Sequence, residues 1–94
     1  MKISTETLPR WETYCENTNA AAALKFDLGN GLEVWYSYKT PVAFRHTKGL
    51  KVRKNAWGPT TGKHLNAIDG GDKSHRLDGM VFEEQLAELL ESLT

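Results

Sequence analysis

The sequence has little of what builds disulfide frameworks, membrane spans or secretory signals. Its one cysteine, Cys15, has nothing to pair with inside the chain, which is typical of a reducing compartment. No apolar run approaches the roughly 20 residues that cross a bilayer. The first residues also lack the apolar core of a secretory signal. We therefore expect a cytoplasmic protein without a membrane partner.

Acidic residues are missing from the middle of the chain. None lies between Glu33 and Asp69, although the whole sequence has 12 acidic and 12 basic residues. The net charge is −2 over residues 1–33, +7 over residues 34–68 and −5 over residues 69–94. The zero total hides a basic centre, and this segregation favours an anionic partner.

Motifs for metals and for nucleotide hydrolysis are missing too. The histidines are too scattered for a zinc site, and the acidic residues of the loop 69–79 do not follow the order of a calcium loop. A P-loop needs four residues between its glycines and a Ser or Thr after its lysine. Gly58 and Gly62 have three residues between them, and His64 follows Lys63. We expect no metal and no cofactor.

A single domain over residues 1–94 is expected from the length and from a composition with 39% hydrophobic and 26% charged residues. Alternating apolar and polar residues indicate a four-stranded antiparallel meander over residues 23–54. Its strands are expected at about 23–28, 32–38, 42–46 and 50–54. Residues 1–20 show no clear period, so we expect a strap or an edge strand there.

The length of each turn sets the register of such a meander, because side chains alternate between its faces. Three-residue loops at 29–31, 39–41 and 47–49 keep the bulky side chains on one face. The pairs that this register predicts are Leu28 with Leu32, Phe26 with Val34, Leu24 with Tyr36, Tyr38 with Val42, Tyr36 with Phe44, His46 with Leu50, and Phe44 with Val52. The opposite face then carries the cations.

Two helices are expected after the meander. Pro59 suits a first helical turn and Gly70-Gly71 a stop, which predicts a short helix over 59–69. Asp78 can cap an amphipathic helix over 79–93, whose leucine stripe would cover the apolar face of the sheet. The predicted fold class is α+β, with both helices packed on one face in two layers. A homodimer through the leucine stripe is an alternative use of that stripe.

The other face of the predicted sheet presents an aromatic ring among cations. The register places Trp35 between Lys25 and Arg45, with Lys51 beyond Arg45. It places Arg53 opposite Ala43, on the same face. Such a platform is typical of proteins that stack bases and hold phosphates, and it also suits an acidic protein surface. A solvated basic face with Trp35 stacked beneath Arg45 is the simpler alternative.

A second candidate site lies at the start of the helix expected from residue 59. The unpaired amides and the dipole of a helix N-terminus attract anions. The polar side chains crowded there are Asn55, Thr60, Thr61, Lys63 and His64. Phosphate or carboxylate would suit this place. The structural alternative is that Thr60 or Thr61 caps the helix and that Asn55 and Asn66 bond backbone in a tight corner.

Three strings carry a resemblance to known proteins: Val34-Trp-Tyr-Ser-Tyr-Lys-Thr-Pro-Val-Ala-Phe44, Asn55-Ala-Trp57 and Thr60-Thr-Gly-Lys-His-Leu-Asn66. In these strings the chain resembles a family of small tailed-bacteriophage proteins, a domain of unknown function. The resemblance implies an accessory protein made in the cytoplasm of a bacterial host, and it implies no activity.

These observations together predict a binding protein that is not an enzyme. Our first hypothesis is capture of a phosphate-bearing ligand, a nucleic acid or a nucleotide signal, by the basic sheet face and the helix start. The alternative is a protein–protein inhibitor of a host or anti-phage defence complex, of the anti-CRISPR kind. Acid–base catalysis by His64 and Lys63 is a further alternative, although the sequence places no nucleophile or carboxylate beside them.

Overall fold

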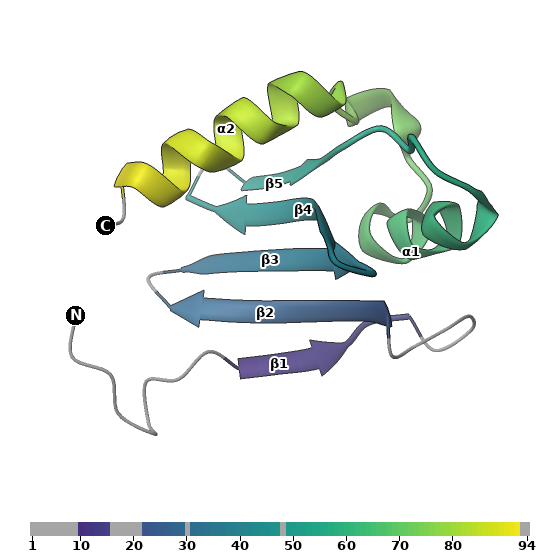
Figure 1. Ribbon diagram of the computed structural model, residues 1–94, viewed down its shortest axis with the longest axis horizontal. Helices are drawn as coiled ribbons and strands as arrows, with labels where there is room; N and C mark the ends of the chain where they lie inside the picture. Colours follow the sequence, from purple (N-terminus) through teal and green to yellow (C-terminus); the bar gives the residue numbers. More distant parts are fainter. Residues whose placement is uncertain (1–9, 16–21, 30, 48, 93–94) are drawn as a thin grey trace.

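The computed structural model describes residues 10–15, 22–29, 31–47 and 49–92. These residues form one antiparallel sheet in chain order, made of β1 (Arg10–Thr13), β2 (Ala23–Gly29), β3 (Leu32–Ser37), β4 (Thr40–His46) and β5 (Gly49–Val52). Helix α1 (Pro59–Asp69), the 3₁₀ turn η2 (Lys73–His75) and helix α2 (Gly79–Ser92) follow. The α+β class is confirmed, with five strands instead of four, because β1 adds the edge strand expected within residues 1–20 (Figure 1).

The first hairpin has the predicted register over most of its length. Phe26 pairs with Val34, and the pair of Leu24 with Tyr36 is confirmed as well. The predicted pair of Leu28 with Leu32 is wrong. Gly29 pairs with Leu32 instead, and the ladder is irregular between residues 27 and 29. Gly29 has a φ of +83°, which is open to glycine at no steric cost, and its amide donates to the Asp27 carboxylate at 3.0 Å.

The second hairpin is tighter than predicted. Ser37 pairs with Thr40, which leaves a two-residue turn in which Tyr38 has a φ of 57°. The predicted pairs of Tyr38 with Val42 and of Tyr36 with Phe44 are therefore wrong. The observed pairs are Tyr36 with Pro41, Trp35 with Ala43 and Val34 with Phe44. The register shifts immediately beyond Pro41, and a proline near such an irregularity is common because proline cannot donate to a ladder.

The third hairpin is shifted by one residue. His46 pairs with Gly49, so the predicted pairs of His46 with Leu50 and of Phe44 with Val52 are wrong. Val52 lies opposite Ala43 instead, and Lys51 lies opposite Phe44. Because a shift of one residue exchanges the faces of a strand, β5 is turned over relative to the prediction.

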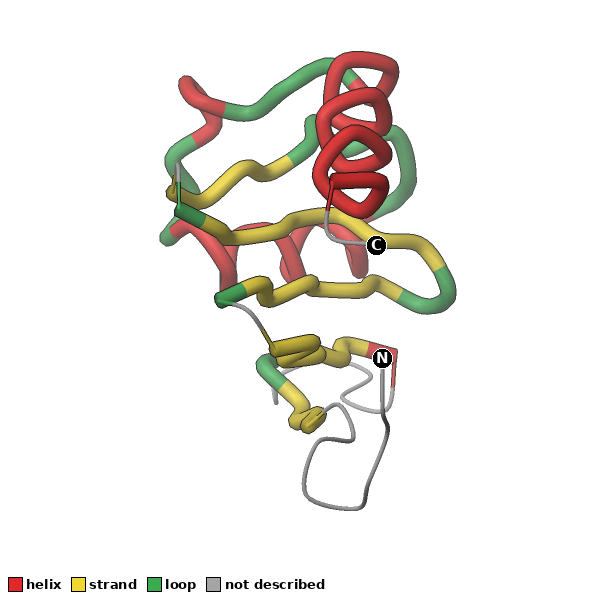
Figure 2. Tube along the Cα trace, turned by 90° about the vertical axis from the view of Figure 1, so that its left-hand side faces the viewer, coloured by secondary structure: helices red, strands yellow, loops and turns green. Residues whose placement is uncertain are grey.

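The two helices cover opposite faces of the sheet, so the predicted two-layer packing is wrong. Helix α2 contributes to one core cluster, made of Leu32, Val34, Phe44, Phe82 and Leu86. Helix α1 contributes to a second cluster, made of Trp35, Val42, Ala43, Val52 and Leu65. Neighbouring residues of a strand point to opposite faces, and the turned-over β5 supplies Val52 to the second cluster. Each helix therefore packs on apolar side chains of the sheet. Helix α2 runs alongside β4 and β5, and α1 lies beside one end of the strands (Figures 1 and 2).

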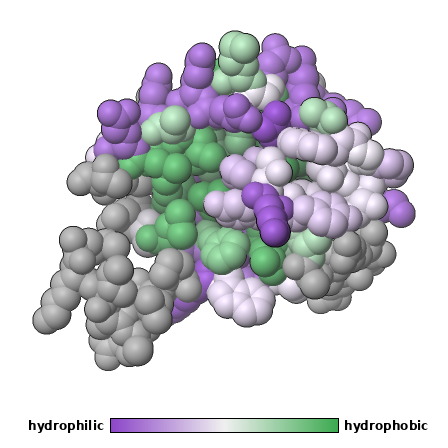
Figure 3. Space-filling view, viewed as in Figure 1, coloured by the Kyte–Doolittle hydropathy of each residue, from purple (hydrophilic) through white to green (hydrophobic). Residues whose placement is uncertain are grey.

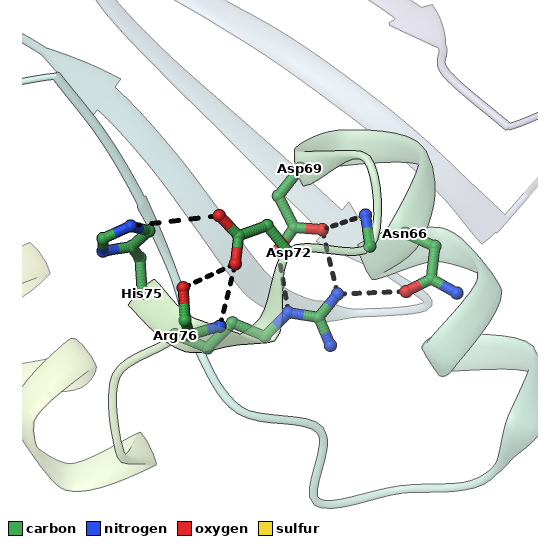
Figure 4. A network of polar contacts seen from close by, with 7 residues as sticks. Asn66, Asp69, Asp72, His75 and Arg76 are labelled. Carbon is green, nitrogen blue, oxygen red and sulfur yellow. Dashed lines mark hydrogen bonds and ion pairs between the residues drawn. The ribbon is translucent and has the colours of Figure 1, made fainter.

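A buried ion pair fixes the segment that joins the two helices. The Arg76 guanidinium donates to Asp69 Oδ2 at 2.7 Å and to Asn66 Oδ1 at 3.1 Å (Figure 4). Burial opposes ionisation of Asp69, but hydrogen bonds from Arg76 and from the Gly71 amide outweigh it and hold the pKa of that carboxyl below its usual value. This clamp anchors the connection that carries the chain from one face of the sheet to the other.

Candidate functional site

The Trp35 ring, which we expected to be open to ligands, lies in the interior on the side of α1. Only 7% of Trp35 is exposed. Lys25 Nζ lies 5.2 Å from the centre of the ring and the Arg45 guanidinium carbon lies 5.5 Å from it. The alternative in which Trp35 is stacked beneath Arg45 describes this geometry.

Glu33 neutralises the two cations beside Trp35. Its carboxylate accepts from Arg45 Nε at 2.7 Å and pairs with Lys25 Nζ at 2.6 Å. The hydrogen bond from Lys25 is the main cause that lowers the pKa of Glu33, against the opposing effect of burial. Sequence reasoning missed this residue, although Glu33 alternates with Val34 and therefore shares a face with Trp35. The shifted register brings it directly opposite Arg45.

Arg53 and Lys51 lie away from Arg45. Arg53 is 8% exposed, and its guanidinium carbon lies 4.7 Å from the centre of the Trp57 ring. Its Nη1 donates to Glu83 of α2 at 3.1 Å, so Arg53 joins the end of β5 to α2. Lys51 is half-buried opposite Phe44, on the face that α2 covers. The expected basic platform is therefore divided between the two faces.

The start of α1 holds its polar side chains in three different ways. Gly58 is the N-cap and makes no side-chain cap, so capping by Thr60 or Thr61 is wrong. Thr61 and the fully buried His64 turn inward to the Ser37 hydroxyl, at 3.0 Å and 2.8 Å. Asn55 bonds backbone in the corner, as the structural alternative proposed: it accepts from the Trp57 amide and donates to the Gly58 carbonyl. Thr60 and Lys63 face solvent at least in part.

The nine predicted site residues do not share one surface. Arg45, Asn55 and Lys63 are exposed, Thr60 and Lys51 are partly exposed, and the others are buried. Ligand binding by the accessible ones stays a prediction. Acid–base catalysis by His64 and Lys63 also stays a prediction. In this structure a substrate would have to reach His64, whose side chain has an exposure of 0%.

An apolar row that crosses the sheet runs from the core to solvent. Phe44 pairs with Val34, Val34 with Phe26, and Phe26 with Trp11. Phe44 and Val34 are buried beneath α2, Phe26 is half-buried, and Trp11 is 65% exposed. Figure 3 shows hydrophobic residues gathered on this face beside α2. Among the described residues, helix α2 therefore packs on β3 and β4 of this face, whereas β2 is half-buried at Leu24 and Phe26 and β1 is exposed at Trp11.

We call the accessible part of this row and its neighbours the open half-face. It consists of Trp11, Leu24, Phe26 and Tyr36, which the register places on one side of β1, β2 and β3. Trp11 is exposed, the other three are half-buried, and Tyr36 packs against the core cluster of α2. The edges of the Phe26 and Tyr36 rings meet at 5.4 Å in a T-shaped contact. The sequence does not reveal the place of Trp11, because the four residues of β1 are too few to show a period.

Strand β1 borders the open half-face and forms one edge of the sheet. All four of its residues are exposed, and no strand of the described residues pairs with its outer side. The opposite edge differs, because Leu77 donates to the Val52 carbonyl and accepts from the Lys54 amide. An unpaired strand edge is a template for another strand.

Within the described part of the chain, no three His, Cys, Asp or Glu side chains are grouped to hold a metal ion. The helices of that part are all too short or too polar to cross a membrane.

A model of a family of unknown function (DUF8033) matches residues 9–84 of the chain. The chain belongs to this family. The comparisons with curated proteins and with solved structures found no match. The matched region begins just before β1 and ends in the first half of α2, so it contains the whole open half-face.

Proposed function

We propose that this chain is a non-enzymatic protein-binding module that docks a partner protein on the open half-face. The observation that supports the proposal most is the row from Phe44 to Trp11, which passes from buried to 65% exposed across four strands. Exposed aromatic residues beside an uncovered apolar surface are typical of protein interfaces. Interface tryptophans are also among the residues that contribute most to affinity.

The state of the cations supports a protein partner over a phosphate-bearing one. Four of the arginines and lysines in or next to the sheet are paired with carboxylates: Lys25 and Arg45 with Glu33, Arg53 with Glu83, and Lys54 with Asp78. A nucleic acid would have to displace these carboxylates, whereas an apolar protein segment would dock on the open half-face without disturbing them.

The resemblance to small phage proteins supplies a class of partner for this proposal. A protein of a bacterial host, or of a complex that defends the host, would be bound through the open half-face and blocked by it. The short chain suits this role, because blocking needs a surface and no pocket.

Capture experiments with matched variants test the proposal. A photoreactive amino acid is placed at position 11 or, as a control, at position 80, where Met80 is 75% exposed on α2. Crosslinking at position 11 identifies the partner in a lysate, and the purified partner is then titrated with Trp11→Ala and Met80→Ala chains. The proposal expects Trp11→Ala to weaken binding at least about tenfold, since truncating a central interface aromatic commonly costs 2 kcal/mol or more. Equal affinities of the two variants would contradict it.

The start of α1 supports a second candidate function, the capture of a small phosphate-bearing ligand. Gly58 leaves the first turn without a side-chain cap, and Lys63 is exposed one turn later. Amide chemical shifts recorded with inorganic phosphate and with nucleotides at low salt test this directly. Binding there should move the signals of residues 60–63, weaken at higher salt, and be lost in Lys63→Ala. Unchanged signals with every compound would remove this candidate.

A further inference from the structure

We infer that the outer edge of β1, with which no strand of the described residues pairs, joins β1 of a second copy of this chain, so that the two open half-faces form one surface. This rests on the proposed function, because the joined surface is then the one presented to the partner protein.

The direction of the main chain in β1 is set by its contact with β2. The Tyr14 amide donates to the Ala23 carbonyl at 3.1 Å, and the register along β1 is regular. Main-chain groups of successive strand residues point to alternate sides, so Arg10 and Glu12 direct theirs toward β2. Trp11 and Thr13 direct their N–H and C=O groups outward. An antiparallel copy centred on Trp11 would therefore exchange both of its main-chain hydrogen bonds with Trp11 of the second copy.

The charges of β1 favour the register centred on Trp11 over registers shifted along the strand. With Trp11 opposite Trp11, Arg10 lies opposite Glu12 of the second copy, and the same pair occurs twice because the arrangement is two-fold symmetric. A register centred on Glu12 would place the two Glu12 carboxylates opposite each other. A register between these two would set Trp11 opposite Glu12 and join the apolar face of one copy to the polar face of the other.

The pairing centred on Trp11 completes the site. A two-fold axis perpendicular to the sheet keeps the same face of both copies on one side. Each copy then adds its Trp11 to the open half-face of the other, and the two tryptophans lie together at the centre. The two α2 helices lie at the outer ends of the combined sheet, away from the axis.

Charge reversal followed by mixing tests the pairing on the full chain. Glu12→Arg places arginines opposite one another and Arg10→Glu places glutamates opposite one another, so each variant alone should dissociate at least about tenfold more readily than the wild type. An equimolar mixture restores both opposite-charge pairs and should form a heterodimer, detected by native mass spectrometry and sedimentation velocity. Circular dichroism of each variant confirms that it is folded.

The outcomes separate this inference from the proposed function. The inference is overturned if the wild-type chain is a monomer at millimolar concentration, or if the variants self-associate as well as the wild type, or if their mixture forms no heterodimer. If the partner protein is still captured through Trp11 in any of these cases, the proposed function holds and only the pairing fails. If the dimer shows the expected charge dependence but no partner protein binds through Trp11, the pairing of the two β1 strands holds and the proposed function fails.

Discussion

The two faces of the sheet are covered by different means. On the α1 face, hydrogen bonds join Ser37 of the sheet to Thr61 and His64 of α1, and ion-paired cations cover the Trp35 ring. On the α2 face, the packing of α2 is apolar and reaches Leu32 and Val34 of β3, and within the described part of the chain Phe26 of β2 is half-buried and Trp11 of β1 is exposed. Of the polar side chains that stand out in the sequence, Thr61 and His64 are buried in contacts within the protein, whereas Asn55 and Lys63 are exposed. The most exposed residue of the open half-face, Trp11, comes from the segment with the least clear pattern.

The largest effect is expected from loosening the apolar cover. Phe82 is fully buried in α2, with its ring 5.4 Å from that of Phe44. Phe82→Ala should lower the free energy of unfolding by about 3–5 kcal/mol, because it removes contacts and leaves a cavity. Chemical denaturation measures this. Leu90→Ala on the exposed side of the same helix is the control, and an equal loss in both variants would show that α2 is not held through Phe82.

Next comes the clamp between the two faces. Asp69→Asn leaves the Arg76 guanidinium buried without its carboxylate, which should cost about 3 kcal/mol at neutral pH. Because the pKa of Asp69 is lowered in the folded chain, the folded state binds fewer protons than the unfolded state near and below pH of about 4. The stabilisation is therefore complete above that pH and is lost as the pH falls through the folded-state pKa.

Unfolding measured over a range of pH checks this sign. The difference between wild type and Asp69→Asn should shrink on acidification, whereas the exposed control Asp78→Asn should show a small difference throughout. A difference that grows toward acid would contradict the assignment of the low pKa to Asp69.

A smaller effect is expected from the polar network of the α1 face. Ser37→Ala removes the hydroxyl that Thr61 and His64 share, which should cost about 1–3 kcal/mol. Thermal unfolding compared with Ser92→Ala, whose hydroxyl is exposed near the end of α2, provides the measurement. Equal stability of these two variants would show that the network does not hold α1 to the sheet.

The smallest effect should follow from removing the carboxylate that neutralises the cations over Trp35. Glu33→Gln loses ion pairs near the surface and should change stability by less than about 1 kcal/mol. It also frees Arg45 and leaves Lys25 with Glu12 as its one remaining carboxylate among the described residues, so weak binding of single-stranded nucleic acid should appear in this variant at low salt. Glu12→Gln, which is more exposed, should not show it. If the wild type binds as tightly as Glu33→Gln, Glu33 does not control the charge of this face.

Parity predicted the register of the first hairpin away from its turn, but a glycine in third place did not fix the register of the third hairpin. The first hairpin was predictable because alternation on both sides of residues 29–31 left one register that kept Phe26 beside Val34. The second was not, because a turn with Tyr38 at positive φ and a register shift next to Pro41 leave no clear signal in the sequence. The register of the second hairpin does not determine that of the third. The third differs from the prediction by one residue, so Val52 and Lys51 lie on the faces opposite to those predicted.

The candidate site was harder to predict than the fold for a related reason. The sequence showed which cations were concentrated in the middle of the chain but not which carboxylates would reach them. Glu83 lies 30 residues from Arg53, and only the packing of α2 brings them together. Trp11 and the edge position of β1 depend on pairing with β2, which four residues cannot reveal through their own pattern.

Hydrogen exchange of the chain with its captured partner tests the central claim most directly. The open half-face predicts slower exchange in residues 10–13 and 23–29 when the partner is bound, with residues 59–64 unchanged. Protection confined to residues 59–64, with β1 and β2 exchanging as in the free chain, would contradict docking on the open half-face.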